Sequence, residues 1–197
     1  MTDQVRDFWN AEAATFDDEP DHGLLDPAVR AAWADLLVPV LPPAPADVID
    51  LGSGTGTLAV LLAQNDYLVR GLDLSERMVA AARAKAAAAD VPIDFRPGDA
   101  AEPPFAPASA DVVLARHMLF MLPDPTAALE RWIGLLRPGG RLVLVEGRWS
   151  TGAGLTGSEC ASLVGNVRKD VSVTRLDDPA LWGHPIDDER YLLVSRS

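Results

Sequence analysis

A run of apolar residues leads directly into three closely spaced glycines in the first third of the chain. Residues 48–58 read Val-Ile-Asp-Leu-Gly-Ser-Gly-Thr-Gly-Thr-Leu, so a predicted strand ends at Gly52, Gly54 and Gly56 and a predicted helix follows. Glycine adopts backbone dihedrals that other residues avoid, and it lets a ligand approach the main chain. The N–H groups that open the following helix point toward such a ligand. The segment therefore predicts a strand–loop–helix junction that binds a ligand.

Strands and helices alternate from this junction to the C-terminus. Such alternation predicts an α/β fold with a mainly parallel sheet and helices on both of its faces. Ligands in these sheets bind beyond the carboxyl ends of the strands, where the winding reverses, and the first junction is such a place. We predict strands at 47–51, 67–74, 93–96, 111–115, 141–145, 171–175 and 191–195, helices at 58–64, 75–89 and 155–166, and a further helix that begins after Asp124, carries Leu136 on its apolar face and ends before Pro138.

The first 38 residues are predicted to be helical. In the first part, apolar side chains recur at helical spacing. Farther along, Asp26 is an N-cap residue, and Pro27 follows at the first helical position, where its missing N–H costs nothing. The residues that suggest these helices are Val5, Phe8, Trp9 and Glu12 in the first and Val29, Trp33, Leu36 and Leu37 in the second.

Length and composition predict one domain over residues 1–197, with the helical segment 1–38 preceding a core at 47–197. No apolar run reaches the length of a membrane span. The segment 1–7 is charged and lacks the apolar stretch of a secretory signal. Cys160 is the only cysteine, which excludes intramolecular disulfides and clusters of cysteine ligands around a metal. These features favour a soluble protein of the cytoplasm.

The charge balance indicates what kind of partner to expect. The chain has 17 basic and 29 acidic residues, a formal net charge of −12. Lysine occurs only at Lys85 and Lys169. Proteins that bind nucleic acid need a basic surface to displace counterions. We therefore expect a small-molecule partner, no nucleic acid and no membrane, and a monomer or a homodimer.

The spacing of the glycines and several features around them make the junction more specific. Its spacing is G-x-G-x-G, which differs from the G-x-G-x-x-G of dinucleotide enzymes, and Asp50 precedes the glycines. Asp73 ends the second predicted strand, where a carboxylate accepts hydrogen bonds from a ribose diol. Asp99 follows the third strand and is placed to accept from the exocyclic amine of a base. Residues 135–145, Leu-Leu-Arg-Pro-Gly-Gly-Arg-Leu-Val-Leu-Val, lead into the fifth strand.

Together these motifs resemble the class I S-adenosylmethionine-dependent methyltransferases, and among them the small-molecule enzymes of the ubiquinone/menaquinone-biosynthesis type (methyltransferase type 11). The resemblance covers roughly residues 8–195. It implies a Rossmann-like, doubly wound seven-stranded sheet of order 3-2-1-4-5-7-6, with strand 7 antiparallel and an N-terminal helical lid. Phe8, Trp9 and Phe16 would be lid aromatics, and an aromatic face suits a sulfonium cation.

The same resemblance implies that S-adenosylmethionine is the cofactor and that the glycine loop lines its methionine part. Asp73 takes the ribose hydroxyls. Leu74 and Ala100 flank the adenine, and Asp99 meets its amine. Arg116, just beyond the fourth strand, lies where the cofactor and the methyl acceptor meet. The predicted cofactor-binding residues are Asp50, Gly52, Ser53, Gly54, Gly56, Asp73, Leu74, Asp99, Ala100 and Arg116.

The predicted reaction is transfer of the cofactor methyl to an O, N or C nucleophile of a small molecule. This transfer is an in-line displacement at a carbon activated by positive sulfur, so the protein mainly aligns the nucleophile and excludes water. No metal is predicted. The alternative is an S-adenosylmethionine-binding protein without turnover. A nicotinamide-dependent reductase is disfavoured by the glycine spacing and because neither Tyr67 nor Tyr191 begins a Tyr-x-x-x-Lys pair.

Two histidines are candidates for catalysis. An O or N acceptor usually arrives protonated, and the ordinary pKa of histidine suits a base at neutral pH. His117 follows the fourth strand at the carboxyl edge of the sheet, and His22 lies in a turn of the lid. His184 is expected in a surface turn, and Trp149 is a candidate substrate contact. The alternative is that alignment alone suffices, with the histidines as ordinary loop residues.

Overall fold

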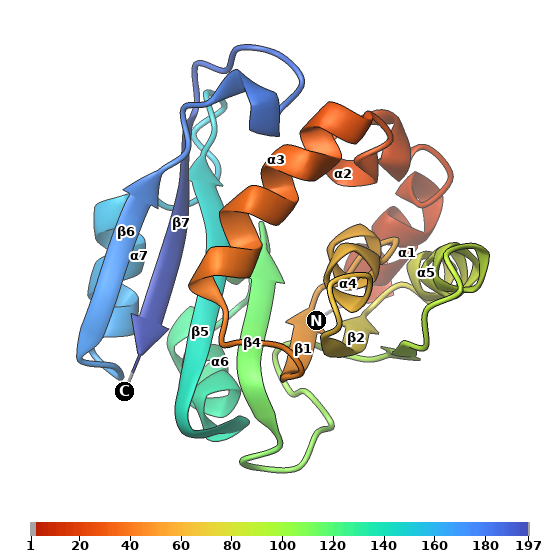
Figure 1. Cartoon of the computed structure of the whole chain (residues 1–197). Coiled ribbons are helices and arrows are strands. Elements are labelled where there is room, and N and C mark those ends of the chain that lie inside the picture. Colours follow the sequence, from red (N-terminus) through yellow and green to blue (C-terminus); the bar gives the residue numbers. More distant parts are fainter. Residues whose placement is uncertain (1–2, 197) are drawn as a thin grey trace.

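Figure 1 shows the computed structural model of the chain, which describes residues 3–196. Met1 and Thr2, the start of the charged segment 1–7, lie outside the described residues, as does Ser197. Within residues 3–196, seven strands form one sheet in the order β3-β2-β1-β4-β5-β7-β6. The strands are β1 (Asp47–Leu51), β2 (Leu68–Asp73), β3 (Asp94–Pro97), β4 (Ala110–Arg116), β5 (Leu136–Arg148), β6 (Asp170–Arg175) and β7 (Glu189–Arg196).

Helices cover both faces of this sheet, with α3 in front of it and α6 and α7 behind it in the view of Figure 1. Among residues 3–196, none of the helices combines the length and the apolar character that crossing a bilayer would require. The α-helices are α1 (Asp3–Glu12), α2 (Pro20–Gly23), α3 (Pro27–Leu37), α4 (Thr57–Ala63), α5 (Glu76–Ala88), α6 (Pro125–Gly134) and α7 (Gly157–Gly165). Short 3-10 helices are η1 (Phe16–Asp18), η2 (Val38–Val40), η3 (Leu119–Met121) and η4 (Pro179–Leu181).

The strand order and directions agree with the predicted fold. Strands β1 to β5 run parallel to one another, whereas β7 is antiparallel to both β5 and β6. Successive residues of the central strands point to opposite faces, and both faces are apolar. Val112 and Leu114 pack against the helices α3, α4 and α5, while Val113 and Ala115 pack on the face of α6 and α7. Strands that are buried on both faces are typical of a parallel sheet. This packing holds the strand ends, and with them the site residues, in place.

The predicted start of α3 is confirmed. The Asp26 carboxylate accepts the N–H of Ala28 at 2.8 Å, and Pro27 is the first helical residue. Trp33 is fully buried, and its indole N–H donates to the carbonyl of Leu181 at 2.8 Å. This helix is therefore fixed firmly to the core beside the lid.

The prediction for the segment after α6 was wrong in its boundaries. Helix α6 ends at Gly134, and Leu136 belongs to β5, which runs to Arg148 instead of covering only 141–145. A bulge in the β4–β5 ladder lets Leu136 pair with Ala110 before the regular register begins. Glycine is a poor helix former, so the chain leaves the helix at Gly134 and enters the sheet early.

Gly71 of β2 is a position where the core has no room for a side chain. A Cβ there would lie 2.3 Å from Cδ1 of Phe95. We expect Gly71→Ala to lower the stability by about 1–3 kcal/mol, or roughly 2–12 °C in Tm. Gly134→Ala is the control, because nothing lies within 4 Å of its Cβ position. Thermal unfolding checks this, and equal Tm values for the two variants would contradict the packing described.

Candidate active site

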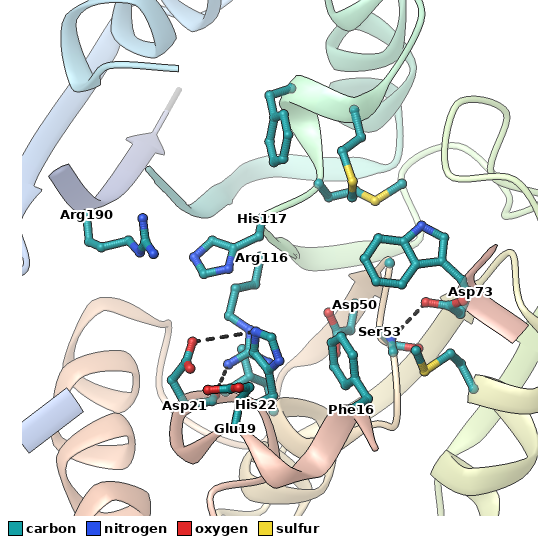
Figure 2. Close-up of a pocket in the computed structure, with 18 of the residues that line it drawn as sticks. Phe16, Glu19, Asp21, His22, Asp50, Ser53, Asp73, Arg116, His117 and Arg190 are labelled. Carbon is teal, nitrogen blue, oxygen red and sulfur yellow. Dashed lines mark hydrogen bonds and ion pairs between the residues drawn. The ribbon is translucent and has the colours of Figure 1, made fainter. Parts of the chain in front are cut away.

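A cavity of about 450 Å³ lies beyond the carboxyl ends of β1, β2 and β4, at the predicted place (Figure 2). Lid residues line it on one side and the strand ends on the other. Of the twelve residues predicted to bind the cofactor or to catalyse, ten line this cavity: Asp50, Gly52, Ser53, Gly54, Asp73, Leu74, Ala100, Arg116, His22 and His117. Gly56 and Asp99 are not among the lining residues.

The glycine loop folds tightly against the end of β2. The N–H groups of Gly52 and Ser53 both donate to the carbonyl of Leu72, at 2.8 and 2.9 Å. Gly52 has a φ of +72°, and a Cβ there would lie 2.7 Å from Sδ of Met118, so only glycine fits without displacing that side chain. Gly56 serves packing, because its Cβ would meet Phe95. The glycine loop thus leaves its main chain accessible to a ligand at the floor of the cavity.

Asp73 both organises this loop and faces the cavity. Its Oδ2 accepts the N–H of Gly54 and its Oδ1 accepts the N–H of Ser75, each at 2.8 Å. Burial raises the pKa of the Asp73 carboxyl, and these two hydrogen bonds oppose the shift. Each carboxylate oxygen has two lone pairs, so both can still accept from a ligand. This geometry suits a pair of adjacent hydroxyl groups.

Asp50 lies at the base of the cavity and is 3% exposed. Burial raises the pKa of its carboxyl to about 7, the nearby guanidinium of Arg116 opposes that shift, and Asp73 adds to it. Burial thus destabilises the ionised form of Asp50, and a positive group that enters the cavity stabilises it. Asp50 is therefore a natural contact for a cationic ligand.

Part of the cavity wall is apolar. Leu74, Met78 and Ala100 line it, as expected for a wall that holds a flat heterocycle. The Asp99 carboxylate accepts the N–H of Ala101 at 2.8 Å, which is a local turn. Its predicted contact with an adenine amine stays a prediction.

The N-terminal segment covers the cavity as a lid. Trp9, Phe16 and His22 are among its lining residues, and a Cβ on Gly54 would lie 3.2 Å from the Phe16 ring. Phe8, expected as a lid aromatic, is 56% exposed and does not line the cavity. Helix α1 buries none of its residues, so the lid rests on a few side chains instead of on an apolar face.

Hydrogen bonds and an ion pair attach the lid to the core. Asp17 pairs with Nζ of Lys85 at 2.8 Å and accepts from the hydroxyl of Thr55 at 2.5 Å. At the other end of the lid, the Ser75 hydroxyl donates to Oδ1 of Asn10 at 2.7 Å. These contacts join the lid to α5 and to the glycine loop, close to the cavity that they enclose.

Removing the charge of Asp17 is expected to loosen this lid. A hydrogen bond to a charged group contributes about 1.5–3 kcal/mol, so Asp17→Asn should speed amide hydrogen exchange in residues 3–23 by roughly 10- to 100-fold. Asp18→Asn removes the same charge from the same turn and is the control. Mass-spectrometric hydrogen exchange measures both, and equal rates in the two variants would show that the Asp17 contacts do not hold the lid.

His117 occupies the far end of the cavity in a constrained position. Its φ is +53°, which is uncommon for a residue other than glycine. Its N–H donates to the carbonyl of Val145 at 2.8 Å, and Oε1 of Glu146 accepts the next two N–H groups of the chain, at 2.9 and 2.7 Å. Burial and the charge of Arg116 hold the pKa of His117 well below its usual value. The fold therefore presents a neutral, fixed imidazole to this end of the cavity.

Aromatic and charged residues complete this end, and the sequence analysis assigned only one of them to the site. Trp149, the predicted candidate for substrate contact, meets the His117 ring edge-on at 5.0 Å between centroids. Trp182, which was not assigned to the site, is stacked with His117 at 6.4 Å between centroids and lines the cavity. Arg190, at the start of β7, donates to Asp188 at 2.9 Å and lies over the Trp149 ring. His184 is exposed, as predicted, and lies at the rim.

Known proteins of similar sequence indicate the family. Residues 49–144 match the family model described as a methyltransferase domain. The chain is 35% identical over 141 residues to the 27-O-demethylrifamycin SV methyltransferase of Amycolatopsis mediterranei (strain S699), which is 70% of this chain and 48% of that protein. These matches, to a methyltransferase domain over about half of the chain and to a relative of which the chain spans 48%, agree with the predicted resemblance to the class I S-adenosylmethionine-dependent methyltransferases.

Two further comparisons extend this resemblance. The chain is 36% identical over 105 residues to the ubiquinone biosynthesis O-methyltransferase of Xanthomonas axonopodis pv. citri (strain 306), covering 53% of this chain and 44% of that protein. The chain thus spans about half the length of these curated relatives. The crystal structure of the cyclase SpnF superposes with a TM-score of 0.74 at 19% identity, over 84% of this chain and 80% of that one, which shows a shared fold.

The cavity fits S-adenosylmethionine, the cofactor that the resemblance implies. The lining residues include five carboxylates and two guanidinium groups, an excess of negative charge that suits a cationic ligand. Asp73 offers free lone pairs where a ribose would lie, and the glycine loop leaves the main chain open at Gly52. The hydroxyl oxygen of Ser53 is buried and has no hydrogen-bond partner within residues 3–196, as expected of a ligand contact. When bound, the cofactor supplies an activated methyl group.

Proposed function

We propose that this chain catalyses transfer of the methyl group of S-adenosylmethionine to an O, N or C nucleophile of a small molecule. The observation that carries the proposal is a single cavity with two different ends. The glycine loop, Asp50 and Asp73 form one end, and His117 with Trp149 and other aromatic side chains forms the other. Relatives named for a rifamycin derivative and for ubiquinone biosynthesis support a small acceptor, with oxygen as the first nucleophile to test.

Each predicted binding residue has a proposed role. Asp73 accepts from the ribose hydroxyls, and Asp50 faces the positive methionine end of the cofactor beside the glycine loop. Leu74 and Ala100 hold the adenine. Arg116 lies between the two ends of the cavity, where its guanidinium donates to the backbone carbonyl of Asp21 in the lid. A closed lid then excludes water from the reacting atoms.

His117 and His22 are the residues proposed to act on the acceptor. His117 comes from the sheet edge and His22 from the lid, so they approach the far end of the cavity from opposite sides (Figure 2). A residue anchored at a strand end is held more firmly than one in a short lid helix, so His117→Gln should lower kcat more than His22→Gln. His184→Gln, which changes the third histidine at the rim, is the control for both.

Production of S-adenosylhomocysteine tests the proposal. The full chain would be incubated with S-adenosylmethionine and a panel of phenols, hydroxy acids and amines, and the products would be analysed by mass spectrometry. We expect S-adenosylhomocysteine and a methylated acceptor in equal amounts, and much less of both with Asp73→Ala at a cofactor concentration that does not saturate the variant. Tight cofactor binding without turnover on any acceptor would favour the alternative, a binding protein without catalysis.

Three further features of the protein are proposals. Residues 1–197 act as a single methyltransferase domain that works as a monomer or a homodimer. The single buried cysteine, Cys160, supports a reducing cytoplasm as the location. Burial raises the pKa of its thiol to about 12, so this thiol is unreactive at neutral pH.

A further inference from the structure

Three potential metal ligands from two distant parts of the chain converge in the cavity. Asp21 and His22 belong to helix α2 of the lid, and His117 follows β4. One potential ligand atom from each lies within 4.8 Å of the other two. Figure 2 shows the imidazole of His117 above the side chains of Asp21 and His22. The sequence predicts no metal here, because the three residues become neighbours only when the lid lies over the sheet.

His117 contributes a nitrogen that needs a partner. Its Nε2 is buried and has no hydrogen-bond partner among the residues that the structure describes. Buried polar atoms are nearly always paired, so an unpaired one indicates a missing ligand, ion or water. The ring cannot easily move to find another partner, because Trp149 and Trp182 contact it on two sides and its backbone holds a φ of +53°.

The imidazole of His22 is also held in place. Its ring stacks on Phe16 with 4.3 Å between centroids and 11° between planes. Its Nε2 lies 3.7 Å from Oδ2 of Asp21. The stacking therefore holds the His22 ring with this nitrogen beside the carboxylate that is proposed as the second ligand.

The charges around the three residues permit a cation. Two guanidinium groups lie nearby, and Asp21 is an anionic neighbour of both, together with Asp50 for Arg116 and Asp188 for Arg190. The cavity lining as a whole includes five carboxylates against these two guanidinium groups, so its charge balance still suits a cation.

We propose that Asp21, His22 and His117 bind one divalent first-row transition-metal ion, for which Zn²⁺ is a suitable probe. Two imidazoles and a carboxylate suit such ions better than Mg²⁺ or Ca²⁺, which prefer oxygen ligands. Three protein ligands leave a fourth position open toward the cavity, as in catalytic zinc sites. An ion there joins the lid to the sheet edge. Where the proposed methyl transfer holds, the ion also offers its open position to an oxygen of the acceptor, and His117 and His22 then act on the acceptor through the ion and not as bases.

Metal titration of the full chain tests this site without any acceptor. After dialysis against a chelator, the protein is titrated with Zn²⁺ in a calorimeter and with Co²⁺ by visible absorbance. We expect one ion per chain, no saturable binding of Mg²⁺, and slower hydrogen exchange in residues 20–23 with Zn²⁺. His22→Gln and Asp21→Asn should each weaken Zn²⁺ binding at least about tenfold. Asp21→Asn keeps the backbone carbonyl that accepts from Arg116.

His184→Gln is the matched control, because it removes an imidazole from the rim of the same cavity and leaves the three proposed ligands intact. It should bind Zn²⁺ with the affinity of the unmodified chain. His22→Gln changes only a partly buried lid residue, so the core should remain folded, and its Tm without metal checks this. The absence of saturable Zn²⁺ binding, unchanged affinity in both lid variants, or an equal loss in His184→Gln would each overturn the proposal.

Discussion

Replacing Asp73 with alanine is expected to weaken binding of S-adenosylhomocysteine by about a hundredfold or more. The variant loses a charged acceptor for two ribose hydroxyls, and each such hydrogen bond contributes about 1.5–3 kcal/mol. It also loses the partner of the N–H groups of Gly54 and Ser75, so the glycine loop loses a constraint as well. The two effects act in the same direction, which makes this the largest loss of affinity that we expect from one side chain.

Calorimetric titration measures this loss. Asp94→Ala is the control, because Asp94 is an exposed aspartate of the neighbouring strand β3 that pairs with Arg96 on the surface. Its affinity should equal that of the unmodified chain. If Asp73→Ala bound S-adenosylhomocysteine as tightly as the control, the ribose would lie elsewhere and the assignment of Asp73 would be wrong.

Replacing Asp50 with asparagine is expected to stabilise the unliganded protein in a way that depends on pH. Burial raises the pKa of the folded-state carboxyl to about 7, against the pull of Arg116 and with the push of Asp73. A carboxyl whose pKa is raised on folding stabilises the fold at low pH, and that stability is lost as the pH rises through the folded-state value. The unmodified chain should therefore lose stability between about pH 4 and 7, and the loss attributable to Asp50 is absent from the variant.

The free energy of unfolding of Asp50→Asn should exceed that of the unmodified chain by about 4 kcal/mol above pH 7, because folding raises the pKa of Asp50 by roughly three units. Thermal unfolding at pH 5, 6, 7 and 8 should show a Tm advantage for Asp50→Asn that grows with pH. The same variant should bind S-adenosylhomocysteine at least about tenfold more weakly, because it lacks the negative charge that faces the methionine end. A Tm difference that does not change with pH would contradict the raised pKa of Asp50.

The parts of the site that depend on local sequence could be predicted. Gly52, Gly54 and Asp73 follow strands whose apolar pattern is plain, and the carboxyl ends of parallel strands meet at one edge of a sheet. The strand order came from the resemblance to a family, since periodicity alone does not order strands. The start of β5 was missed because its pairing with Ala110 depends on a bulge, which has no clear signature in the sequence.

The acceptor end depends on contacts between residues far apart in the chain, and sequence reasoning assigned fewer of its residues. Arg190 and Asp188 reach the cavity because β7 runs antiparallel beside β5, and nothing in their immediate sequence marks them. Asp21 meets His117 only through the path of the lid. Phe8 shows the opposite error, because the resemblance to the family suggested that it faces the cavity as a lid aromatic, whereas its side chain is exposed.

The central claim is that this cavity binds S-adenosylmethionine through the glycine loop and Asp73, and calorimetric titration of the full chain tests it most directly. The chain would be titrated separately with S-adenosylhomocysteine and with NAD. The account predicts one molecule of S-adenosylhomocysteine per chain, a rise in Tm with its concentration, and no binding of NAD. Saturable binding of NAD, or no binding of S-adenosylhomocysteine, would contradict it.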